Sequence, residues 1–305
     1  MAHYGLATVK VGGHPAPAVC AGERVLPLAQ AAPVRGLAGH PVPSTTRAAL
    51  ADWDRWCDVA EAAAQAGTGE HWMAADTVEF CPAITDPPNI YCAGANYHDH
   101  VREMSGQAPG AGGRPFHFVA AMSALNGHDR PVTRPAGCEQ LDWEVELAVL
   151  IGRPAYRVDA GHALAAVAGY TVANDLSLRD FAQRTDVPFF PDWLLSKCYA
   201  ECLPLGPAIV PARDIPDPMN LGLTLTVNGE PRQASNTKEM IFSVAQQIEY
   251  LSHAVPLRPG DVILTGTPAG TAARWGTYLE PGDVVVADIE KVGSLRNHIV
   301  AAAGA

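Results

Sequence analysis

The order of apolar and polar positions predicts a chain of many short strands with few helices. Runs of β-branched and aliphatic residues are bounded by glycine and proline, which is the pattern of strands joined by turns. Short apolar pieces such as residues 7–11 and 24–28 predict strands near the N-terminus. A helix ending near Gly67 is predicted by apolar residues that recur every three or four positions: Leu50, Trp53, Cys57, Ala60 and Ala64.

Two apolar runs in the middle of the chain, 141–152 and 168–173, predict strands. Farther on, Asn228-Gly229 follows another apolar run and is a strong signal for a hairpin turn. The chain thus predicts an α+β fold that is mostly β.

The C-terminal third predicts one helix and two further strands. The helix has apolar positions at the usual spacing: Ile241, Val244, Ile248, Leu251 and Val255. Asn236 with Glu239 resembles a capping box at its start. Pro-Gly-Asp occurs at 259–261 and at 281–283, and each copy predicts a turn that leads into a strand.

The Asp86-Pro87-Pro88 segment interrupts the pattern, and we place a domain boundary there. We expect a small N-terminal β/α module over residues 1–85 and a larger domain over residues 86–305. A chain of 305 residues is long enough for both to bury apolar side chains. The glycine-rich stretch 106–113 lacks the ending of a phosphate-binding loop and predicts a lid-like loop.

Composition and charge exclude several classes of function. Hydrophobic residues make up 48% of the chain, yet no apolar run approaches the roughly 20 residues that span a bilayer. The net charge of −11 disfavours nucleic acids and anionic membranes as partners. The seven cysteines form no Cys-x-x-Cys pair and the N-terminus shows no secretory signal, so we expect reduced thiols and a cytoplasmic location.

Two carboxylates interrupt the apolar run 141–152. In a strand, Glu144 and Glu146 leave the same face, where their charges repel and burial disfavours both. A hard divalent cation between them would resolve this conflict, whereas a solvated acidic strand face is the alternative. Asp175 follows the strand at 168–173 and is well placed to complete a site of three carboxylates.

A possible acid–base pair lies in the segment after residue 94. If a helix begins near Tyr97, His100 and Glu103 lie three positions apart on one face, so that the carboxylate can orient the imidazole. A surface histidine with an incidental neighbour is the alternative.

Other candidates are single residues in polar or irregular segments. Lys197 is either solvated or able to stabilise negative charge on a substrate oxygen. Arg179 either pairs with Asp180 or neutralises a substrate carboxylate. The segment 265–271 is either a plain turn or a close approach to a ligand, with Thr267 offering a hydroxyl.

Together these segments resemble the fumarylacetoacetate hydrolase family over roughly residues 85–300. The motifs that carry the resemblance are, in chain order, Gly-Ala-Asn-Tyr at 94–97 with His100 and Glu103, then 142–152, 169–180, 204–207, 260–270 and 293–297. Six motifs in order are far more specific than any one of them.

The resemblance implies a mixed β-sheet roll, a homodimer and a site for Mg²⁺ or Mn²⁺. The implied metal ligands fall on Glu144, Glu146 and Asp175. The implied catalytic residues are His100, Glu103 and Lys197, and we expect Tyr97, Arg179 and Thr267 to contact substrate. Family substrates are mostly acidic 1,3-dicarbonyl or 2-oxo compounds.

The chain departs from the family pattern at three positions. The family commonly has a lysine in the segment aligned with 118–122, where this chain has none, near Ala120. It often has a glutamine where Ala182 stands and an aspartate where Ala200 stands. These departures alter the expected pocket and leave the implied metal ligands intact.

Our leading functional hypothesis is metal-dependent hydrolysis of a C–C bond between two carbonyls, with His100 and Glu103 activating water. The main alternative is decarboxylation, isomerisation or hydration of a 2-oxo acid through the same enolate. A third possibility is a metal-binding scaffold that has lost catalysis.

Overall fold

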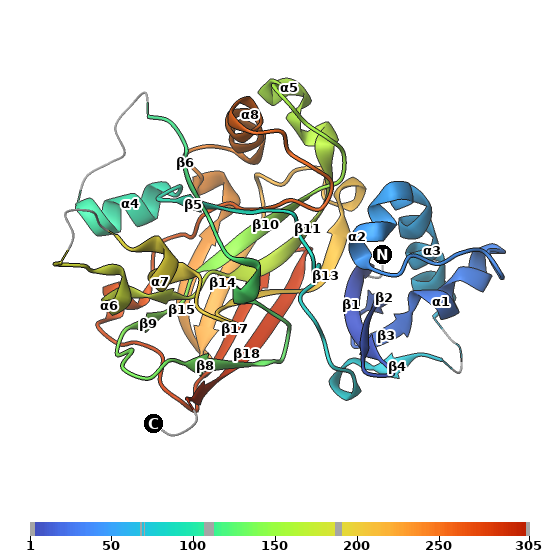
Figure 1. Cartoon of the computed structure of the whole chain (residues 1–305), viewed down its shortest axis with the longest axis horizontal. Helices are drawn as coiled ribbons and strands as arrows, with labels where there is room; N and C mark the ends of the chain where they lie inside the picture. Colours follow the sequence, from blue (N-terminus) through green and yellow to red (C-terminus); the bar gives the residue numbers. More distant parts are fainter. Residues whose placement is uncertain (1–3, 68, 70, 107–112, 187–190, 303–305) are drawn as a thin grey trace.

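The computed structural model describes residues 4–67, 69, 71–106, 113–186 and 191–302. The predicted lid-like loop at 106–113 therefore lies largely outside the described residues. Two sheets dominate the described part of the chain, and helices lie around them (Figure 1).

The larger sheet crosses the whole molecule. In spatial order its strands are β4 (Met73–Ala74), β3 (Arg24–Pro27), β2 (His14–Ala21), β1 (Tyr4–Val11), β13 (Leu203–Pro211), β11 (Val167–Asn174), β10 (Val145–Ile151), β16 (Val262–Leu264), β5 (Ile90–Gly94) and β6 (Phe116–Val119), with β7 (Leu125–Asn126) paired to β13. Most neighbours are antiparallel, but β16 and β5 run parallel, so the sheet is mixed.

The second sheet packs against strands β10, β11 and β13 of the first. Its strands are β15 (Glu230–Asn236), β14 (Gly222–Val227), β17 (Val284–Ile289), β18 (Gly293–Ala301) and β8 (Pro131–Arg134). A separate short ladder joins β9 (Leu141–Asp142) to β12 (Ser177–Leu178). This arrangement of mixed sheets with mostly short helices around them confirms the predicted α+β, mostly β roll.

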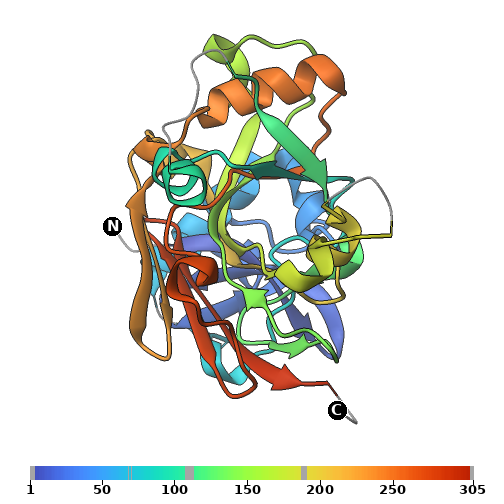
Figure 2. The ribbon, with the colours of Figure 1, turned by 90° about the vertical axis from the view of Figure 1, so that its left-hand side faces the viewer.

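The α-helices are α1 (Leu28–Ala31), α2 (Thr46–Ala49), α3 (Trp53–Ala66), α4 (His98–Ser105), α5 (Ala160–Ala163), α6 (Arg179–Ala182), α7 (Trp193–Lys197), α8 (Val244–Ala254) and α9 (Ala272–Trp275). Among these, α3, α4 and α8 are long and the others are short. Helices α4, α6 and α7 lie at the same end of the molecule, the end that faces the viewer in Figure 2. Within the described ranges, no helix is long and apolar enough to cross a membrane.

Strand β10 is buried on both faces, and this fixes the place of Glu146. Val145, Leu147 and Val149 pack in the core between the two sheets, whereas Ala148 and Leu150 pack in a second apolar cluster. Because side chains alternate along a strand, Glu146 leaves the same face as Ala148. The carboxylate therefore enters the interior and does not reach solvent.

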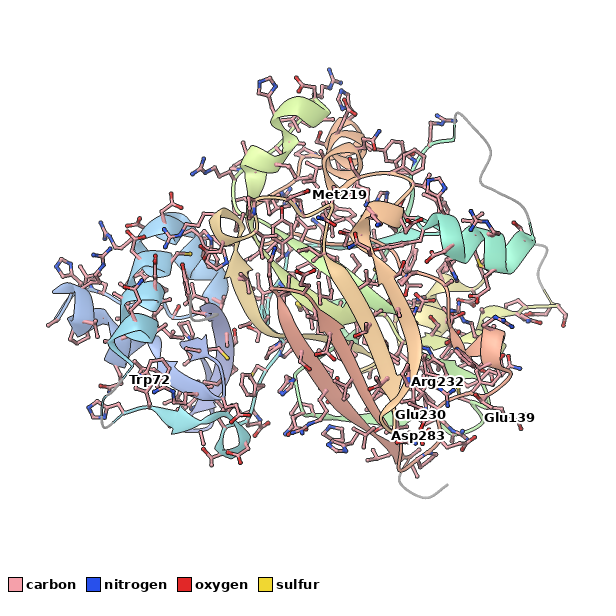
Figure 3. All side chains as sticks on the ribbon, turned by 180° about the vertical axis from the view of Figure 1, so that it is seen from behind. Trp72, Glu139, Met219, Glu230, Arg232 and Asp283 are labelled. Atoms are coloured by element: carbon pink, nitrogen blue, oxygen red, sulfur yellow. The ribbon has the colours of Figure 1, made fainter. Side chains whose placement is uncertain are left out.

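The N-terminal module is continuous with the larger sheet. Its strand β1 pairs with β13, and Leu6 stands opposite Ile209. Helix α3 covers the module's own apolar cluster. Figure 3 shows Trp72 of this module and Arg232 of β15 on opposite sides of the molecule. That residues 1–85 form a separate domain remains a prediction.

Two sequence predictions of local structure were wrong in detail. The strand expected over 141–152 is interrupted, because the Asp142 carboxylate accepts a hydrogen bond from the Trp143 backbone at 2.7 Å and β10 begins only at Val145. The capping box of α8 is formed by Ser243 and Gln246, whereas Asn236 caps a short 3₁₀ turn ahead of it.

The hairpin prediction was confirmed. Asn228 and Gly229 both have positive φ, 54° and 80°, as the tight turn between β14 and β15 requires.

Candidate metal centre and active site

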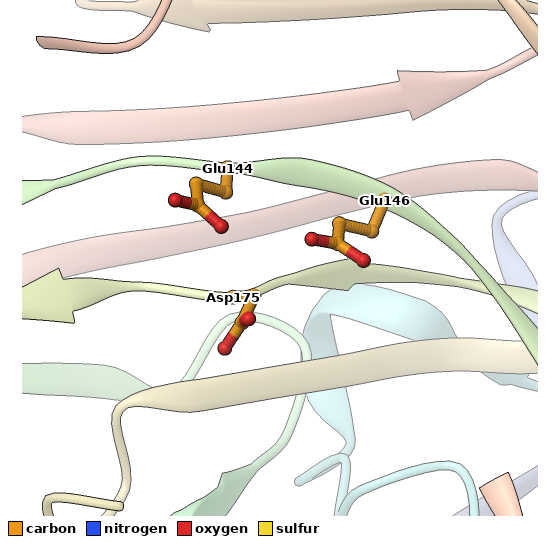
Figure 4. Close-up of side chains that lie close together, drawn as sticks. All are labelled: Glu144, Glu146 and Asp175. Atoms are coloured by element: carbon orange, nitrogen blue, oxygen red, sulfur yellow. The ribbon is translucent and has the colours of Figure 1, made fainter. Parts of the chain in front are cut away.

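Three buried carboxylates meet where β10 and β11 lie side by side. Glu144 immediately precedes β10, Glu146 belongs to it, and Asp175 follows β11. The antiparallel register sets Val145 opposite Asn174, and the Asp175 backbone N–H donates to the Glu144 carbonyl at 2.9 Å. One carboxylate oxygen from each residue lies within 4.8 Å of the others, and all three side chains are buried (Figure 4).

The electrostatics of these carboxylates differ. Burial, reinforced by Asp175 and Glu144, raises the pKa of Glu146 well above its ordinary value. Burial also raises the pKa of Asp175 to about 6, although Lys197 opposes the shift. Burial alone would raise the pKa of Glu144, but Lys197 and Arg179 outweigh it and lower that pKa to about 2. Lys197 and Arg179 therefore favour the ionised form of Glu144, whereas burial and the neighbouring carboxylates disfavour the ionised form of Glu146.

The donor atoms fit a hard divalent cation. Within the described residues, Asp175 Oδ1 is buried and has no hydrogen-bond partner. Glu146 accepts the Gly266 N–H at 2.6 Å through Oε2. Three carboxylates in a water-poor setting are the oxygen-rich ligand set that Mg²⁺ or Mn²⁺ prefers. The three carboxylates predicted as metal ligands therefore lie together as a cluster, and their binding of a metal ion remains a prediction.

Lys197, the last residue of α7, lies against two of these carboxylates. Its Nζ donates to Glu144 Oε2 at 2.7 Å, to Asp175 Oδ2 at 2.8 Å and to the Asp175 carbonyl at 2.9 Å. Burial lowers its pKa, but Asp175 and Glu144 more than offset this and raise that pKa above its ordinary value. Lys197 is therefore a charged, buried group whose three N–H bonds all have acceptors.

Arg179, at the start of α6, contacts the same cluster. Its Nε donates to Asp142 Oδ2 at 2.8 Å and its Nη2 to Glu144 Oε1 at 2.5 Å. Asp142 in turn accepts the Ala272 N–H at 2.6 Å. The guanidinium is thus held by two buried carboxylates of the protein, and its predicted contact with a substrate carboxylate remains a prediction.

His100 and Glu103 lie on one face of α4, as the spacing predicted. His100 Nδ1 is 3.8 Å from Glu103 Oε2, beyond hydrogen-bond distance, and that oxygen accepts the Gly270 N–H at 3.0 Å. Burial lowers the pKa of His100, which favours the neutral imidazole near pH 7. A neutral imidazole beside a carboxylate can accept a proton and have the resulting charge stabilised.

The two remaining sequence candidates are buried. Tyr97 directly precedes α4, and within the described part of the chain its hydroxyl has no hydrogen-bond partner. The Thr267 hydroxyl donates to the Val145 carbonyl at 3.0 Å and accepts from Gln233 at 2.9 Å. Both are near the strand that carries Glu146, and their contact with substrate remains a prediction.

Sequence reasoning missed several residues that support the site. Asp142 holds Arg179, Gln233 holds both Thr267 and the Val145 N–H, and Asp99 anchors α4. Asp142 had a signal, since it lies two positions before Glu144. Gln233 had none, because nothing in a hairpin strand marks one glutamine as buried.

The three departures from the family pattern occupy different surroundings. Ala120 is buried and belongs to the apolar cluster beneath β10, so a small side chain fills the place aligned with a lysine. Ala182 ends α6 and is half-buried, and Ala200 is exposed. The charged and polar groups that these alanines replace are therefore missing from the surroundings of α6 and α7.

The fold is a mixed β-sheet roll that carries a buried cluster of three carboxylates, and comparison with known proteins identifies the family. The model of the fumarylacetoacetate (FAA) hydrolase C-terminal family matches residues 89–300. Oxaloacetate tautomerase FAHD2A, mitochondrial, from Bos taurus is 40% identical over 225 residues, which cover 73% of this chain and 70% of the relative. The chain belongs to the fumarylacetoacetate hydrolase family.

Solved structures agree with this assignment. Fumarylacetoacetate hydrolase from the psychrophilic Exiguobacterium antarcticum superposes with a TM-score of 0.76 at 28% identity, covering 98% of this chain and 100% of that one. Maleylpyruvate hydrolase from Sphingobium sp. SYK-6, solved with manganese(II) and pyruvate, shares the fold with a TM-score of 0.75 at 24% identity, covering 97% of this chain and 99% of that one.

Proposed function

We propose that this enzyme uses Mg²⁺ or Mn²⁺ to interconvert the keto and enol forms of a 2-oxo acid that carries a second carboxylate. The observation that carries the proposal is the buried cluster of Glu144, Glu146 and Asp175, whose oxygens fit a hard cation. The 40% identical bovine relative, named as an oxaloacetate tautomerase, supports the choice of reaction.

The protein's own groups suit a proton transfer between carbon and oxygen. When bound, the divalent ion supplies a Lewis acid for the oxygens of the 2-oxo acid. Neutral His100 accepts the proton from the carbon next to the carbonyl, and Glu103 stabilises the imidazolium. His100 then returns the proton to the oxygen, so that the C–H bond is exchanged for an O–H bond without any other reactant.

Tautomerisation is tested by following the ultraviolet absorbance of enol oxaloacetate with and without added Mg²⁺ or Mn²⁺. We expect the protein to accelerate loss of the enol only with metal. Glu146→Ala should abolish that acceleration, whereas Glu230→Ala, an exposed glutamate at the start of β15, should retain it. A metal-dependent rate of Glu146→Ala equal to that of the parent would contradict the proposal.

Hydrolysis of a C–C bond in an acylpyruvate-like substrate is the second candidate, and the His100–Glu103 pair favours it. The same base could activate water, and cleavage gives two fragments that contain one solvent oxygen. Product analysis in labelled water separates the reactions, because tautomerisation gives no fragments and decarboxylation releases CO₂. Metal binding without turnover of any acylpyruvate or 2-oxo diacid would instead identify a scaffold.

The homodimeric state and the cytoplasmic location of the protein also remain predictions. We propose a homodimer, which sedimentation analysis of the purified protein tests directly. The seven cysteines are free, which is compatible with the expected cytoplasmic location, whereas the name of the bovine relative assigns that protein to mitochondria. Fluorescent tagging of the full chain in its own cells decides between the two compartments.

A further inference from the structure

Helix α4 carries His100 but has little apolar surface to hold it in place. Of its eight described residues, only His100 is buried, and Met104 is 59% exposed. Hydrophobic burial is the usual force that holds a helix against a sheet, and here it is small. The position of His100 must therefore depend on polar contacts between α4 and its neighbours.

Asp99 makes the contacts that fix the first turn of α4. Its Oδ2 accepts the Ser235 hydroxyl of β15 at 2.8 Å, and its Oδ1 accepts the Ala269 N–H at 3.3 Å. Oδ1 also accepts the N–H of His100 at 2.7 Å. One half-buried carboxylate thus joins the helix start to β15 and to the loop that follows β16.

The loop that follows β16 also contacts the metal site. The Gly266 N–H donates to Glu146 at 2.6 Å, and the Gly270 N–H donates to Glu103 at 3.0 Å. Asp99 binds the loop between these two points, at Ala269. The loop therefore holds α4 and Glu146 at a fixed separation, with Asp99 and Glu103 as its two attachments to the helix.

We propose that Asp99 is a positioning residue that places the His100 imidazole against the metal centre, an inference that rests on the proposed role of His100 as base. Asp99 itself has no part in the proton transfer, since its carboxylate is committed to Ser235, Ala269 and the helix backbone. Its removal frees the first turn of α4 and misplaces the imidazole.

Small displacements of a catalytic group carry a large kinetic cost, because a shift of about 1 Å can lower a rate by about 100-fold. For Asp99→Ala we expect kcat to fall by about 10- to 100-fold, with KM and Mn²⁺ affinity changed by less than about twofold. Asp99→Asn keeps one acceptor oxygen and should recover part of the rate. Ser235→Ala removes a single contact and should lose least.

Asp159→Ala is the matched control. Asp159 also accepts a backbone N–H in the first turn of a helix, that of His162 in α5, but it lies outside the site. This variant should keep the parental kcat and the parental hydrogen exchange of α4. In Asp99→Ala, by contrast, the amides of Val101 to Glu103 should exchange at least about tenfold faster, which corresponds to about 1.4 kcal/mol of lost protection.

A double-mutant cycle with His100→Ala completes the test. If Asp99 acts through His100, adding Asp99→Ala to His100→Ala should not lower the residual rate further. An additional tenfold loss in that background, or unchanged exchange of α4 in Asp99→Ala, would overturn the positioning role. If His100→Ala alone kept the parental rate, the proposed role of His100 as the base would be refuted. The hydrogen exchange of α4 would then show separately whether Asp99 holds the first turn of the helix.

Discussion

The ammonium of Lys197 lies 2.7 Å from Glu144 Oε2, and the two side chains are 3% and 8% exposed. Each group would be costly to bury alone, and the pair is stabilised only because the partners satisfy each other together with Asp175. Lys197 thus belongs to the acidic cluster, where it balances part of the negative charge. Any contact that it makes with a substrate comes in addition to this role.

Lys197→Met should therefore destabilise the protein strongly. Removing one partner leaves buried carboxylates uncompensated, which typically costs about 3–5 kcal/mol. Urea unfolding in a chelating buffer measures this loss. Lys238→Met, which changes an exposed lysine, is the control and should cost less than about 0.5 kcal/mol. Equal stability of the two variants would show that the Lys197 contacts contribute little.

A divalent ion should stabilise the folded protein by binding to the carboxylate cluster. At free Mn²⁺ of about 100 times Kd, binding to the native state alone adds about 2.7 kcal/mol. Thermal unfolding with chelator, then with Mn²⁺ or Mg²⁺, should show a rise in Tm that saturates. Glu146→Ala should show no such rise, and a shift equal to that of the parent would place the ion elsewhere.

The sequence predicted the carboxylate cluster well because each residue lies in or beside a run of strand residues. Glu146 follows from alternation in β10, and Asp175 from the end of β11. Glu144 was predicted on the same regular strand, but it lies just outside β10. It reaches the cluster through contacts with Lys197 and Arg179, which alternation does not describe.

The sequence could not predict how the cations are distributed. Lys197 was read in an irregular segment, whereas it ends α7, a helix of only five residues capped by Asp192. The partner that the sequence offered for Arg179 within the protein was Asp180, whereas Arg179 binds Asp142, 37 positions away. Long-range ion pairs of this kind depend on which strands meet, and no local pattern contains that information.

Gly270→Ala should damage both stability and the site. Gly270 has φ of +99°, and a Cβ atom there would lie 2.2 Å from the Arg232 carbonyl oxygen. We expect a loss of about 2 kcal/mol or more and a lower kcat, because the Gly270 N–H holds Glu103.

Gly276→Ala is the matched control for this substitution. Gly276 also has positive φ, +66°, but a Cβ atom there meets nothing within 4 Å. It should cost only the backbone strain, about 1 kcal/mol, and leave kcat unchanged. If the two variants had identical unfolding curves and rates, the loop that follows β16 would have no role in stabilising or positioning the site.

The stability of the protein should fall between pH 6.5 and pH 4 partly because of His128. Burial lowers the pKa of this imidazole from its ordinary value of 6.5 to about 4, although Asp129 opposes the shift. Its Nδ1 accepts the backbone N–H of Arg296 at 3.1 Å, a bond that protonation removes. The unfolded chain therefore binds the proton more readily than the folded one across this range.

The sign follows from proton linkage. The contribution of His128 is fully present above pH 6.5, falls as the pH is lowered to about 4, and is constant below that; its full size is about 3 kcal/mol. His128→Asn keeps an acceptor near the Arg296 N–H but does not titrate. Urea unfolding should show the parent losing about 2–3 kcal/mol more than the variant between pH 7.5 and pH 4. A difference between parent and variant that does not change with pH would assign the acid sensitivity to other groups.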